Sequence, residues 1–366
     1  MVMDGDVPYL PQEIFANILI RLPVKSLIRF QCVCKDWKNL FKTPSFIAEH
    51  ARHSTQQDSV LLFKSPRYKC KPACLCLINR DMQVLEYQTP SVHSCTIGSS
   101  NGLLCLLHVW SFILWNPATR EVFQVPKAPN INRNVIFYVG FGFSPVVNDY
   151  KIVTISLSRL YGDGVYLVHV FSVSTRSWKE VEGGKLKGIL AFVTRGFSFD
   201  GAIFWFGTGL KGQGRSLLSF DIATESFKLI PIPSSVHVTF ESRLTKYENK
   251  LALLSKTRVE STKSFFISLW VMGKCMDTSG ERCIWTKIYT SNPFPDMKLS
   301  SALTIWRNEI VIVGVTEGKT VLVSCNLHTN EVKMWTIGNY SLETFFWNYA
   351  ESLVSVGDIH IEASSS

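Results

Sequence analysis

The fold is decided by a stretch that reads Leu114-Trp115-Asn116-Pro117-Ala118-Thr119-Arg120-Glu121-Val122-Phe123. An apolar run leads into Asn116, Thr119 closes the polar segment, and a second apolar run follows. Asn and Thr side chains bond nearby backbone groups in turns, so this pattern predicts a β-hairpin. The same Thr, with an apolar residue three positions later, recurs at Thr175, Thr224 and Thr329. A version with a longer turn spans residues 269–288.

A second unit precedes each hairpin and consists of a turn residue followed by an apolar strand. Its copies include Asn101-Gly102-Leu103-Leu104 and Asp200-Gly201-Ala202-Ile203-Phe204. Successive markers of this unit are separated by 49, 51, 48 and 59 residues, and they are Leu103, Ile152, Ile203, Leu251 and Ile310. A period of roughly fifty residues is in the range of kelch-type propeller blades.

The repeat therefore predicts an all-β, propeller-like domain of about six blades. Residues 73–87 are expected to be a degenerate first copy, and 351–356 to be the strand that closes the ring. Propellers close in this way when the two chain ends share a blade. A β-sandwich with long hairpins is the alternative fold.

The first fifty residues follow a helical pattern instead. Ile14, Ile18 and Leu22 recur at spacing four, and Pro23 ends the first helix. A second helical stretch begins at Val24, and a third short one follows Thr43-Pro44, so three helices are expected. A unit this small cannot bury all of its apolar residues internally. Some of them are therefore expected to contact a partner.

Composition and charge exclude several classes of protein. The chain has 366 residues, of which 46% are apolar and 18% charged, so it can bury a core and is not a disordered chain. The first residues contain no basic segment followed by an apolar one, and the apolar runs are too short and interrupted to span a bilayer. These features favour an intracellular protein with reduced cysteines, located in the cytoplasm, the nucleus or both.

The helical segments and the repeats resemble a known family. Leu10-Pro11-Gln12-Glu13-Ile14, Arg21 to Leu27 and Arg29 to Trp37 resemble the plant F-box motif. The remainder is similar to the kelch-like F-box-associated domain, in Leu114 to Arg120 and Gly140 to Pro145 among others. This resemblance implies an F-box over residues 4–52, an F-box-associated β domain over 55–360 and a flexible tail over 361–366.

Proteins with these two domains are substrate receptors of SCF-type cullin-RING ubiquitin ligases. The resemblance implies that the F-box docks a Skp-type adaptor, and through it the cullin and RING subunits, while the β domain recruits a target protein for ubiquitination. Residues that the resemblance places in the adaptor interface, or in direct support of it, are Leu10, Pro11, Ile14, Ile18, Leu22, Pro23, Leu27, Val33, Cys34 and Trp37.

Motifs that would indicate catalysis or a cofactor have better structural explanations. Gly207-Thr208-Gly209-Leu210-Lys211-Gly212 matches G-x-G-x-x-G, but a second strand follows where a dinucleotide site needs a helix, so a hairpin loop is predicted. Cys70, Cys74 and Cys76 lack the second knuckle of a zinc site. The sequence shows no H-E-x-x-H or G-x-S-x-G. A non-catalytic subunit with no metal and no cofactor is therefore expected, against the alternative of an enzyme in the propeller.

Positive charge belongs mainly to the β domain. The net charge is +9, and residues 1–50 contribute only +1, with six Lys and Arg against five Asp and Glu. The loops that should emerge on one face of the propeller carry more cations than acids, namely Arg159, Lys211, Arg215, Lys256, Arg258, Lys263 and Lys319 against Asp163, Glu260 and Glu317. This predicts a basic face that holds an acidic or phosphorylated target segment. The alternatives are a solvated rim without a role and a nucleic-acid- or glycan-binding propeller that the F-box tethers to the adaptor.

Overall fold

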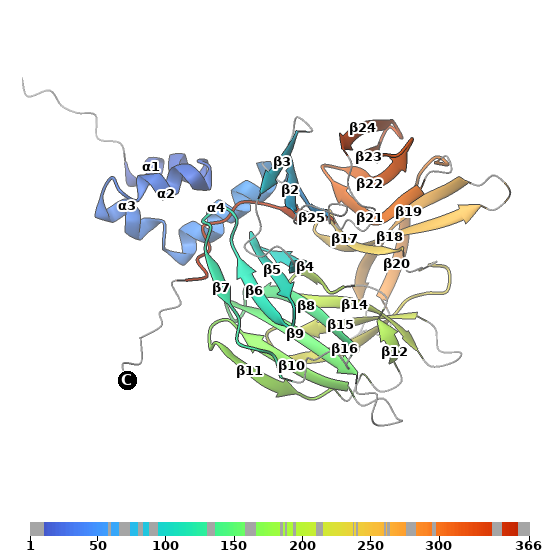
Figure 1. The fold of residues 1–366 in the computed structure, drawn as a ribbon, viewed down its shortest axis with the longest axis horizontal. Coiled ribbons are helices and arrows are strands. Elements are labelled where there is room, and N and C mark those ends of the chain that lie inside the picture. The colour runs from blue at the N-terminus through green and yellow to red at the C-terminus, as the bar shows by residue number, and fades with distance from the viewer. Residues whose placement is uncertain are drawn as a thin grey trace, which may run out of the picture.

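A computed structural model gives the fold of most of the chain. It describes residues 11–57, 60–65, 74–79, 83–87, 94–129, 136–157, 166–183, 186, 189–192, 195–209, 215–236, 238, 241–259, 261, 264–275, 283–294, 298–338 and 346–357. A helical head at the N-terminus lies beside an all-β body (Figure 1). No helix in these ranges is both long and apolar enough to cross a bilayer.

The head contains four helices over its described residues, and not the predicted three. They are α1 (Gln12–Ile20), α2 (Val24–Phe30), α3 (Lys35–Leu40) and α4 (Pro44–Gln57). The expected second helix is interrupted because the backbone at Cys34 is extended, with φ −153° and ψ 165°. Its Sγ accepts a hydrogen bond from the Trp37 amide at 3.4 Å and so caps the start of α3. Pro11 and Pro23 immediately precede α1 and α2, and Pro23 separates these two helices as the sequence predicted.

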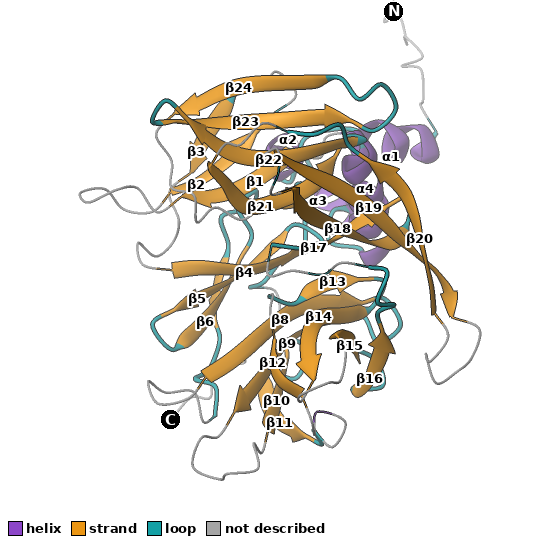
Figure 2. Cartoon of the chain, turned by 90° about the vertical axis from the view of Figure 1, so that its right-hand side faces the viewer, coloured by secondary structure: helices purple, strands orange, loops and turns teal. Residues whose placement is uncertain are grey.

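The body consists of six sheets over the described residues, arranged around a centre (Figure 2). In chain order, the sheets are β1 (Val60–Ser65), β2 (Cys74–Ile78) and β3 (Val84–Tyr87) with β25 (Phe346–Tyr349); β4 (Ser94–Ser100), β5 (Leu103–His108), β6 (Ser111–Trp115) and β7 (Val122–Gln124); β8 (Ile136–Ser144), β9 (Asp149–Leu157), β10 (Tyr166–Ser172) and β11 (Ser177–Val181); β12 (Ile189–Phe192), β13 (Phe197–Phe199), β14 (Ala202–Gly209), β15 (Arg215–Asp221) and β16 (Ser226–Pro231); β17 (Arg243–Tyr247), β18 (Lys250–Val259), β19 (Ser264–Cys275) and β20 (Cys283–Thr290); and β21 (Lys298–Trp306), β22 (Glu309–Thr316), β23 (Lys319–Asn326) and β24 (Val332–Gly338). This architecture confirms the propeller-like prediction, and residues 73–87 do supply strands of the first blade.

The ring is closed by β25, which pairs antiparallel with β1 and joins the last strand of the chain to the first blade. The prediction that 351–356 is the closing strand is therefore wrong, because these residues leave the sheet and run toward the head. Neighbouring inner strands contact one another around the centre, and β25 contacts β4 to complete the circle. A β-sandwich has no such ring, so the alternative fold is excluded.

The hydrophobic core lies between the blades. Six apolar clusters each join two neighbouring sheets, so burial on both faces explains why many strands are wholly apolar. Trp178 and Trp285, on the return strands of two hairpins, pack into two of these layers. A seventh cluster forms the core of the head.

The turns show why the repeated polar residues are needed. Asn116 Oδ1 accepts hydrogen bonds from the amides of Ala118 and Thr119 at 3.0 and 3.4 Å. Asn326 makes the same pair of bonds at 2.9 and 3.0 Å in the last blade, and Asp221 makes one of them at 2.7 Å. The residue after each Thr has a positive φ, which these side-chain bonds help to hold.

Candidate functional site

Apolar side chains are exposed on one part of the head. Ile14 and Ile18, one turn apart on α1, are 45% and 48% exposed, and Val33 is 62% exposed. Phe15 is 37% exposed and its ring lies 6.4 Å from that of Trp37, which connects α1 to α3. Isolated apolar residues are common on protein surfaces, but this group lies on adjoining elements of one small unit.

The structure distinguishes two kinds of residue among those predicted for adaptor binding. Pro11, Pro23 and Cys34 are exposed like Ile14, Ile18 and Val33, whereas Leu22 and Trp37 are half-buried. Leu27 is fully buried in the head core and can only support the surface. Leu10 lies outside the described residues. The name "apolar head surface" is used below for Pro11, Ile14, Phe15, Ile18, Val33 and Cys34.

Phe15 belongs to this surface although sequence reasoning did not select it. The helical stripe of Ile14, Ile18 and Leu22 does not include it, and its spacing to Trp37 in the sequence gives no sign of contact. Trp37 also lies against Phe30 and Phe41, with ring centroids 5.7 and 6.4 Å away. The aromatic contacts through Trp37 fix the orientation of α1 against α3, a tertiary effect that periodicity does not reveal.

The head is fastened to the propeller by residues 350–357, called here the C-terminal strap. Figure 1 shows this dark red segment passing between the helices and the sheet that contains β7. The Val24 amide at the start of α2 donates a hydrogen bond to Glu351 Oε2 at 3.3 Å. Leu353 is buried in the head core, and Ala118 of the propeller packs against the same cluster. The head core is thus completed by residues from the other end of the chain.

Asn116 fixes the strap on the propeller side. It is fully buried, and its Nδ2 donates to the carbonyl oxygens of Ser352 and Val354 at 2.9 and 2.7 Å. The Val356 amide donates a hydrogen bond at 2.8 Å to Oε2 of Glu121, which follows the turn that begins at Asn116. Gly102 has φ +77°, and a Cβ at this position would lie 2.4 Å from that of Ser352. The turns of this blade are therefore shaped to receive the strap.

Only some of the residues predicted for the basic face lie within the described part of the chain. Arg159, Lys211 and Lys263 lie outside the described residues. Arg215 and Arg258 are exposed at the ends of β15 and β18 that point away from the turns facing the head. Lys256 is held by Glu241 at 3.1 Å and lies 4.9 Å from the centre of the Phe265 ring, so it is engaged within the protein.

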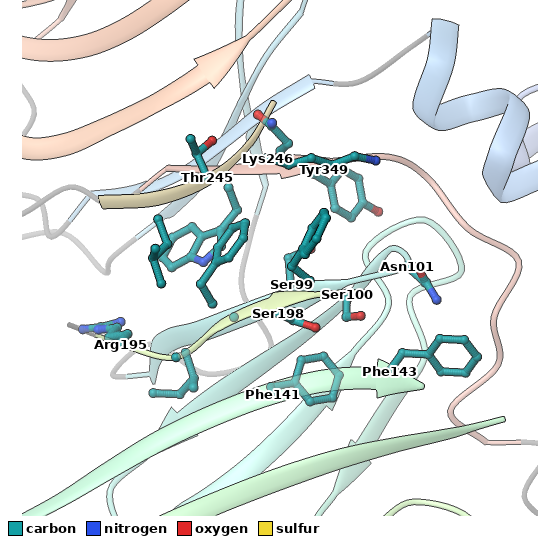
Figure 3. A pocket seen from close by; sticks show the side chains of 18 of the residues that line it. Ser99, Ser100, Asn101, Phe141, Phe143, Arg195, Ser198, Thr245, Lys246 and Tyr349 are labelled. Carbon is teal, nitrogen blue, oxygen red and sulfur yellow. The ribbon is translucent and has the colours of Figure 1, made fainter. Parts of the chain in front are cut away.

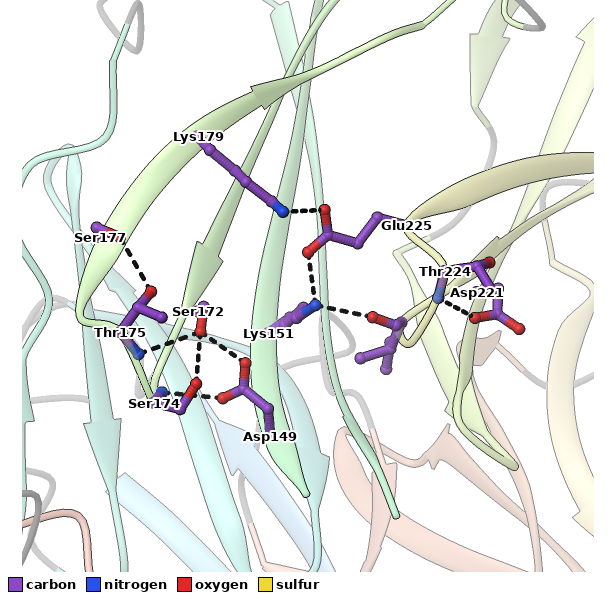
Figure 4. A network of polar contacts seen from close by, with 11 residues as sticks. Asp149, Lys151, Ser172, Ser174, Thr175, Ser177, Lys179, Asp221, Thr224 and Glu225 are labelled. Carbon is purple, nitrogen blue, oxygen red and sulfur yellow. Dashed lines mark hydrogen bonds and ion pairs between the residues drawn. The ribbon is translucent and has the colours of Figure 1, made fainter. Parts of the chain in front are cut away.

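A polar network joins two blades on the side of the turns (Figure 4). Lys151 is buried, and its Nζ donates to the Ile222 carbonyl at 2.9 Å and to Glu225 at 2.5 Å. Lys179 contacts the other carboxylate oxygen of Glu225, also at 2.5 Å. Burial raises the pKa of Glu225, but hydrogen bonds from both lysines more than offset this and lower it below the usual value. With its charges paired, the network is suited to holding two blades together.

A cavity of about 1040 Å³ occupies the centre of the ring (Figure 3). Arg195 lies at one end of it, and Asn101 and Phe143 lie at the other. Among the described residues, the charged side chains that line it are Arg195, Arg243, Lys246 and Asp200. Sequence reasoning missed these cations because it searched the loops between strands, whereas Arg195 precedes an inner strand and Arg243 begins one.

Other groups that could carry chemistry are structural. Among the described residues no three His, Cys, Asp or Glu side chains are grouped to hold a metal. His50 is buried, and its Nε2 lies 3.0 Å from the Leu22 carbonyl oxygen. Gly207 and Thr208 pair with Ser216 and Arg215, so the first half of the glycine motif lies in a strand of an antiparallel pair, while Leu210, Lys211 and Gly212 lie outside the described residues.

One cysteine departs from the expectation of a fully reduced chain. Cys283 is disulfide-bonded, and Cys275 occupies the opposite position in the register of β19 and β20. Cys76, Cys105 and Cys325 are buried, as small apolar residues would be.

Comparison with known proteins agrees with the two-part organisation. Residues 8–48 match the family model described as F-box domain, and residues 50–358 match that described as F-box associated beta propeller domain. The Arabidopsis thaliana F-box/LRR-repeat/kelch-repeat protein At2g27520 is 25% identical over 95% of this chain and 97% of its own length. The F-box/kelch-repeat protein At3g23880 of the same organism is 29% identical over 61% of this chain and 65% of its own.

Solved structures give weaker matches. The oligogalacturonate lyase of Vibrio parahaemolyticus aligns over 75% of this chain and 78% of its own, with 9% identity and a TM-score of 0.42.

Proposed function

We propose, since the chain belongs to the family of F-box proteins with an F-box associated beta propeller domain, that it is the substrate-recognition subunit of an SCF-type cullin-RING ubiquitin ligase. The head docks a Skp-type adaptor, and the propeller recruits the protein to be ubiquitinated. The observation that carries this proposal is the apolar head surface. Its side chains are exposed and do not form part of the core of the head.

Docking through this surface has a clear energetic basis. Ile14, Ile18 and Val33 each retain about half or more of their accessible area, which an apolar partner would remove from water. Burial of a large aliphatic side chain contributes roughly 1.5–3 kcal/mol when it is complete. The aromatic contacts through Trp37 keep the surface ordered before binding, so little conformational entropy is lost on docking.

The chain itself supplies no reacting group in this proposal. A receptor raises the rate of ubiquitin transfer by holding the target lysine near a charged conjugating enzyme, which is catalysis by proximity. The C-terminal strap supports this role, because it joins the head to the propeller through Leu353, Glu351 and Asn116. A fixed angle between the two parts would set where the target lies.

The target surface is proposed to be the propeller face remote from the head, where Arg215 and Arg258 are exposed. Exposed cations favour encounter with acidic or phosphorylated segments and increase the association rate. Replacing both with Glu is expected to weaken target binding and leave adaptor binding intact. Unchanged target binding in this double variant would show that the face has no recognition role.

Adaptor docking is tested by co-purification of the full chain with a Skp-type adaptor. The variant Ile14→Asp with Ile18→Asp places charges on the apolar head surface, and both positions are exposed enough to leave the head folded. Val146→Asp is the matched control, because Val146 is 82% exposed on the propeller. The double variant should lose the adaptor while the control retains it. Full retention by the double variant would refute the assignment.

A further inference from the structure

A shallow hollow of about 570 Å³ lies on the propeller face remote from the head, in the blade of β4 to β7. It forms where the turn between β5 and β6 meets the segment that leaves β7, and its lining includes Val109, Trp110, Gln124, Val125, Pro126 and Lys127. The opposite ends of β6 and β7 are joined by the turn at Asn116, which holds the C-terminal strap (Figure 1). The hollow is therefore separated from the head by the length of the blade, and it faces the same way as Arg215 and Arg258.

The turn between β5 and β6 is strained at Val109. Its φ is +54°, and among the positive-φ residues of the described chain Val109 alone is branched at Cβ. A left-handed backbone is unfavourable for such a residue, so this position is a genuine outlier. Of the two central residues of the turn only the first has a positive φ, and hairpins usually place Gly there. The equivalent turn of the last blade is Glu317-Gly318, with φ +50° and +75°, so the fold does not require a branched residue at such a turn.

The strain at Val109 is not explained by packing. Its side chain is 62% exposed, so burial does not offset the unfavourable backbone. Trp110 beside it is half-buried, and its ring lies 6.1 Å from the Phe137 ring with 63° between their planes. Strained residues that the core does not need cluster at functional sites. The turn therefore presents a valine and a fixed tryptophan to an outside partner.

Polar groups of the hollow have no partner within the part of the chain that the structure describes. The Trp110 indole N–H makes no hydrogen bond to these residues, and the Lys127 ammonium makes no ion pair with them. Gln124, Pro126 and Lys127 are all exposed. The Trp178 Nε1 donates to the Pro126 carbonyl oxygen at 2.8 Å and so fixes the other wall of the hollow. Two neutral donors and one cation thus lie beside apolar walls.

This lining suits an extended segment that contains proline. Aromatic-lined surfaces accommodate the rigid rings of polyproline II segments. Such a backbone has no internal hydrogen bonds, so its carbonyl oxygens can accept from the Trp110 indole and the Gln124 amide. A helix satisfies its own carbonyl oxygens and would leave both donors unused. Lys127 favours an acidic side chain next to the proline.

We propose that this hollow binds an extended, proline-containing segment of the target protein, with an acidic residue beside the proline. Trp110 and Pro126 hold the proline ring, and Lys127 contacts the acid. That the segment belongs to the protein to be ubiquitinated rests on the receptor function proposed above, whereas binding of such a segment does not depend on adaptor docking.

The test is a titration of a fluorescent peptide, Pro-Pro-Leu-Pro-Pro-Glu-Glu, with the full chain, followed by fluorescence anisotropy. Saturable binding is expected. A peptide with Ala in place of every Pro, and one with Lys in place of both Glu, should each bind roughly 10-fold more weakly or not at all. No saturable binding of the first peptide, or equal binding of the Ala peptide, overturns the proposal.

Two variants show whether the peptide uses the hollow. Trp110→Phe removes the indole N–H and keeps a ring against Phe137, whereas Lys127→Glu reverses the charge. Each should weaken binding roughly 5- to 20-fold, as the loss of one hydrogen bond or one charged contact predicts. Lys250→Glu is the matched control, because Lys250 is exposed at the start of β18 on the opposite face. Binding that neither variant weakens contradicts the proposal.

Val109→Gly separates recognition from folding. Glycine relieves the positive φ, so the midpoint of urea unfolding should be unchanged or higher. Peptide binding should nevertheless weaken roughly 5-fold, because the exposed methyl groups are lost. Glu317→Gly changes the equivalent turn of the last blade and should leave binding unchanged. A lower midpoint with unchanged binding would show that Val109 serves the fold, and it would count against the proposal.

The outcome for the hollow and the outcome for the adaptor can be distinguished. The variant Ile14→Asp with Ile18→Asp should bind the peptide as the parent does. Failure of the unmodified chain to bind a Skp-type adaptor would contradict the proposed function and leave the peptide site standing. Adaptor binding without peptide binding would overturn the site and leave the proposed function standing.

Discussion

Substitution of Asn116 by Asp should detach the C-terminal strap. Asp preserves the size of the side chain and the oxygen that accepts the turn hydrogen bonds, but it cannot donate to the carbonyls of Ser352 and Val354. Asp221 shows that a carboxylate can occupy this position in another blade, where it accepts a bond from the Thr224 amide at 2.7 Å. The turn should therefore survive, and the strap contacts should not.

The magnitude follows from the two bonds, whose lengths are 2.9 and 2.7 Å. Each lost bond costs about 1 kcal/mol net, and leaving buried oxygens unmatched costs about 1 kcal/mol more. We expect a loss of about 3 kcal/mol, which corresponds to hydrogen exchange of residues 351–357 that is roughly a hundredfold faster. Exchange mass spectrometry of the full chain measures this, and α2 should be affected through Leu353 and Glu351.

Asn326→Asp is the matched control. Asn326 makes the same turn bonds to His328 and Thr329 in the last blade, two places round the ring from the blade of Asn116. Its substitution should change stability by less than about 0.5 kcal/mol. Equal losses in the two variants would refute the reasoning, because they would show that the turn and not the strap determines the effect.

Three further predictions concern the joints of the fold. In urea unfolding, Gly102→Ala should destabilise the chain well beyond Gly318→Ala. Both glycines have positive φ, at +77° and +75°, so either substitution should cost about 1 kcal/mol of stability for that reason. Only the Cβ added at position 102 would also meet Ser352. Equal effects would contradict the close strap contact. Glu225→Gln should cost about 3 kcal/mol by leaving the buried Lys151 charge without its carboxylate. Because hydrogen bonds outweigh burial and lower the pKa of Glu225, its contribution is present above the ordinary carboxyl value of about 4.3 and is lost as pH falls through the lowered value. Urea titrations between pH 7 and 3 should therefore show the variant and the parent converging in acid, and a constant difference would argue against the pairing. Burial lowers the pKa of His50, so the neutral ring stabilises the head above about pH 6.5, and this contribution declines as pH falls through the lowered value. His50→Gln should therefore flatten the pH dependence of stability in urea titrations of the chain. An unchanged slope would exclude His50 as the source of that dependence.

Much of the propeller could be predicted from local signals. The turns can be recognised in the sequence because the hydrogen bonds that hold them join residues within four positions of one another. The side chains that accept these bonds are Asn116, Asp221 and Asn326. The closing strand was placed wrongly because β25 and the strap are both short and partly apolar, and only pairing with β1 distinguishes them. The break before α3 was missed because it depends on the extended backbone at Cys34 and not on a proline or glycine.

The candidate sites were predictable to different degrees. The resemblance to the F-box motif selected Ile14 and Ile18, whereas the surplus of apolar residues on a small helical unit predicted only that some of them contact a partner. Leu27 has the same character in sequence and yet is fully buried, since exposure depends on how α2 packs against the strap and α4. Arg195 and Arg243 carried no sequence signal, because their positions in the cavity arise only when distant inner strands meet around the ring.

The central claim, that the head docks a Skp-type adaptor through its apolar surface, is tested most directly by hydrogen exchange of the full chain with and without purified adaptor. The account predicts slower exchange in α1 and in residues 31–40 when the adaptor is present, and no change in β14, β15, β18 or β19. Protection confined to the propeller strands, or no protection of α1 at saturating adaptor, would contradict it.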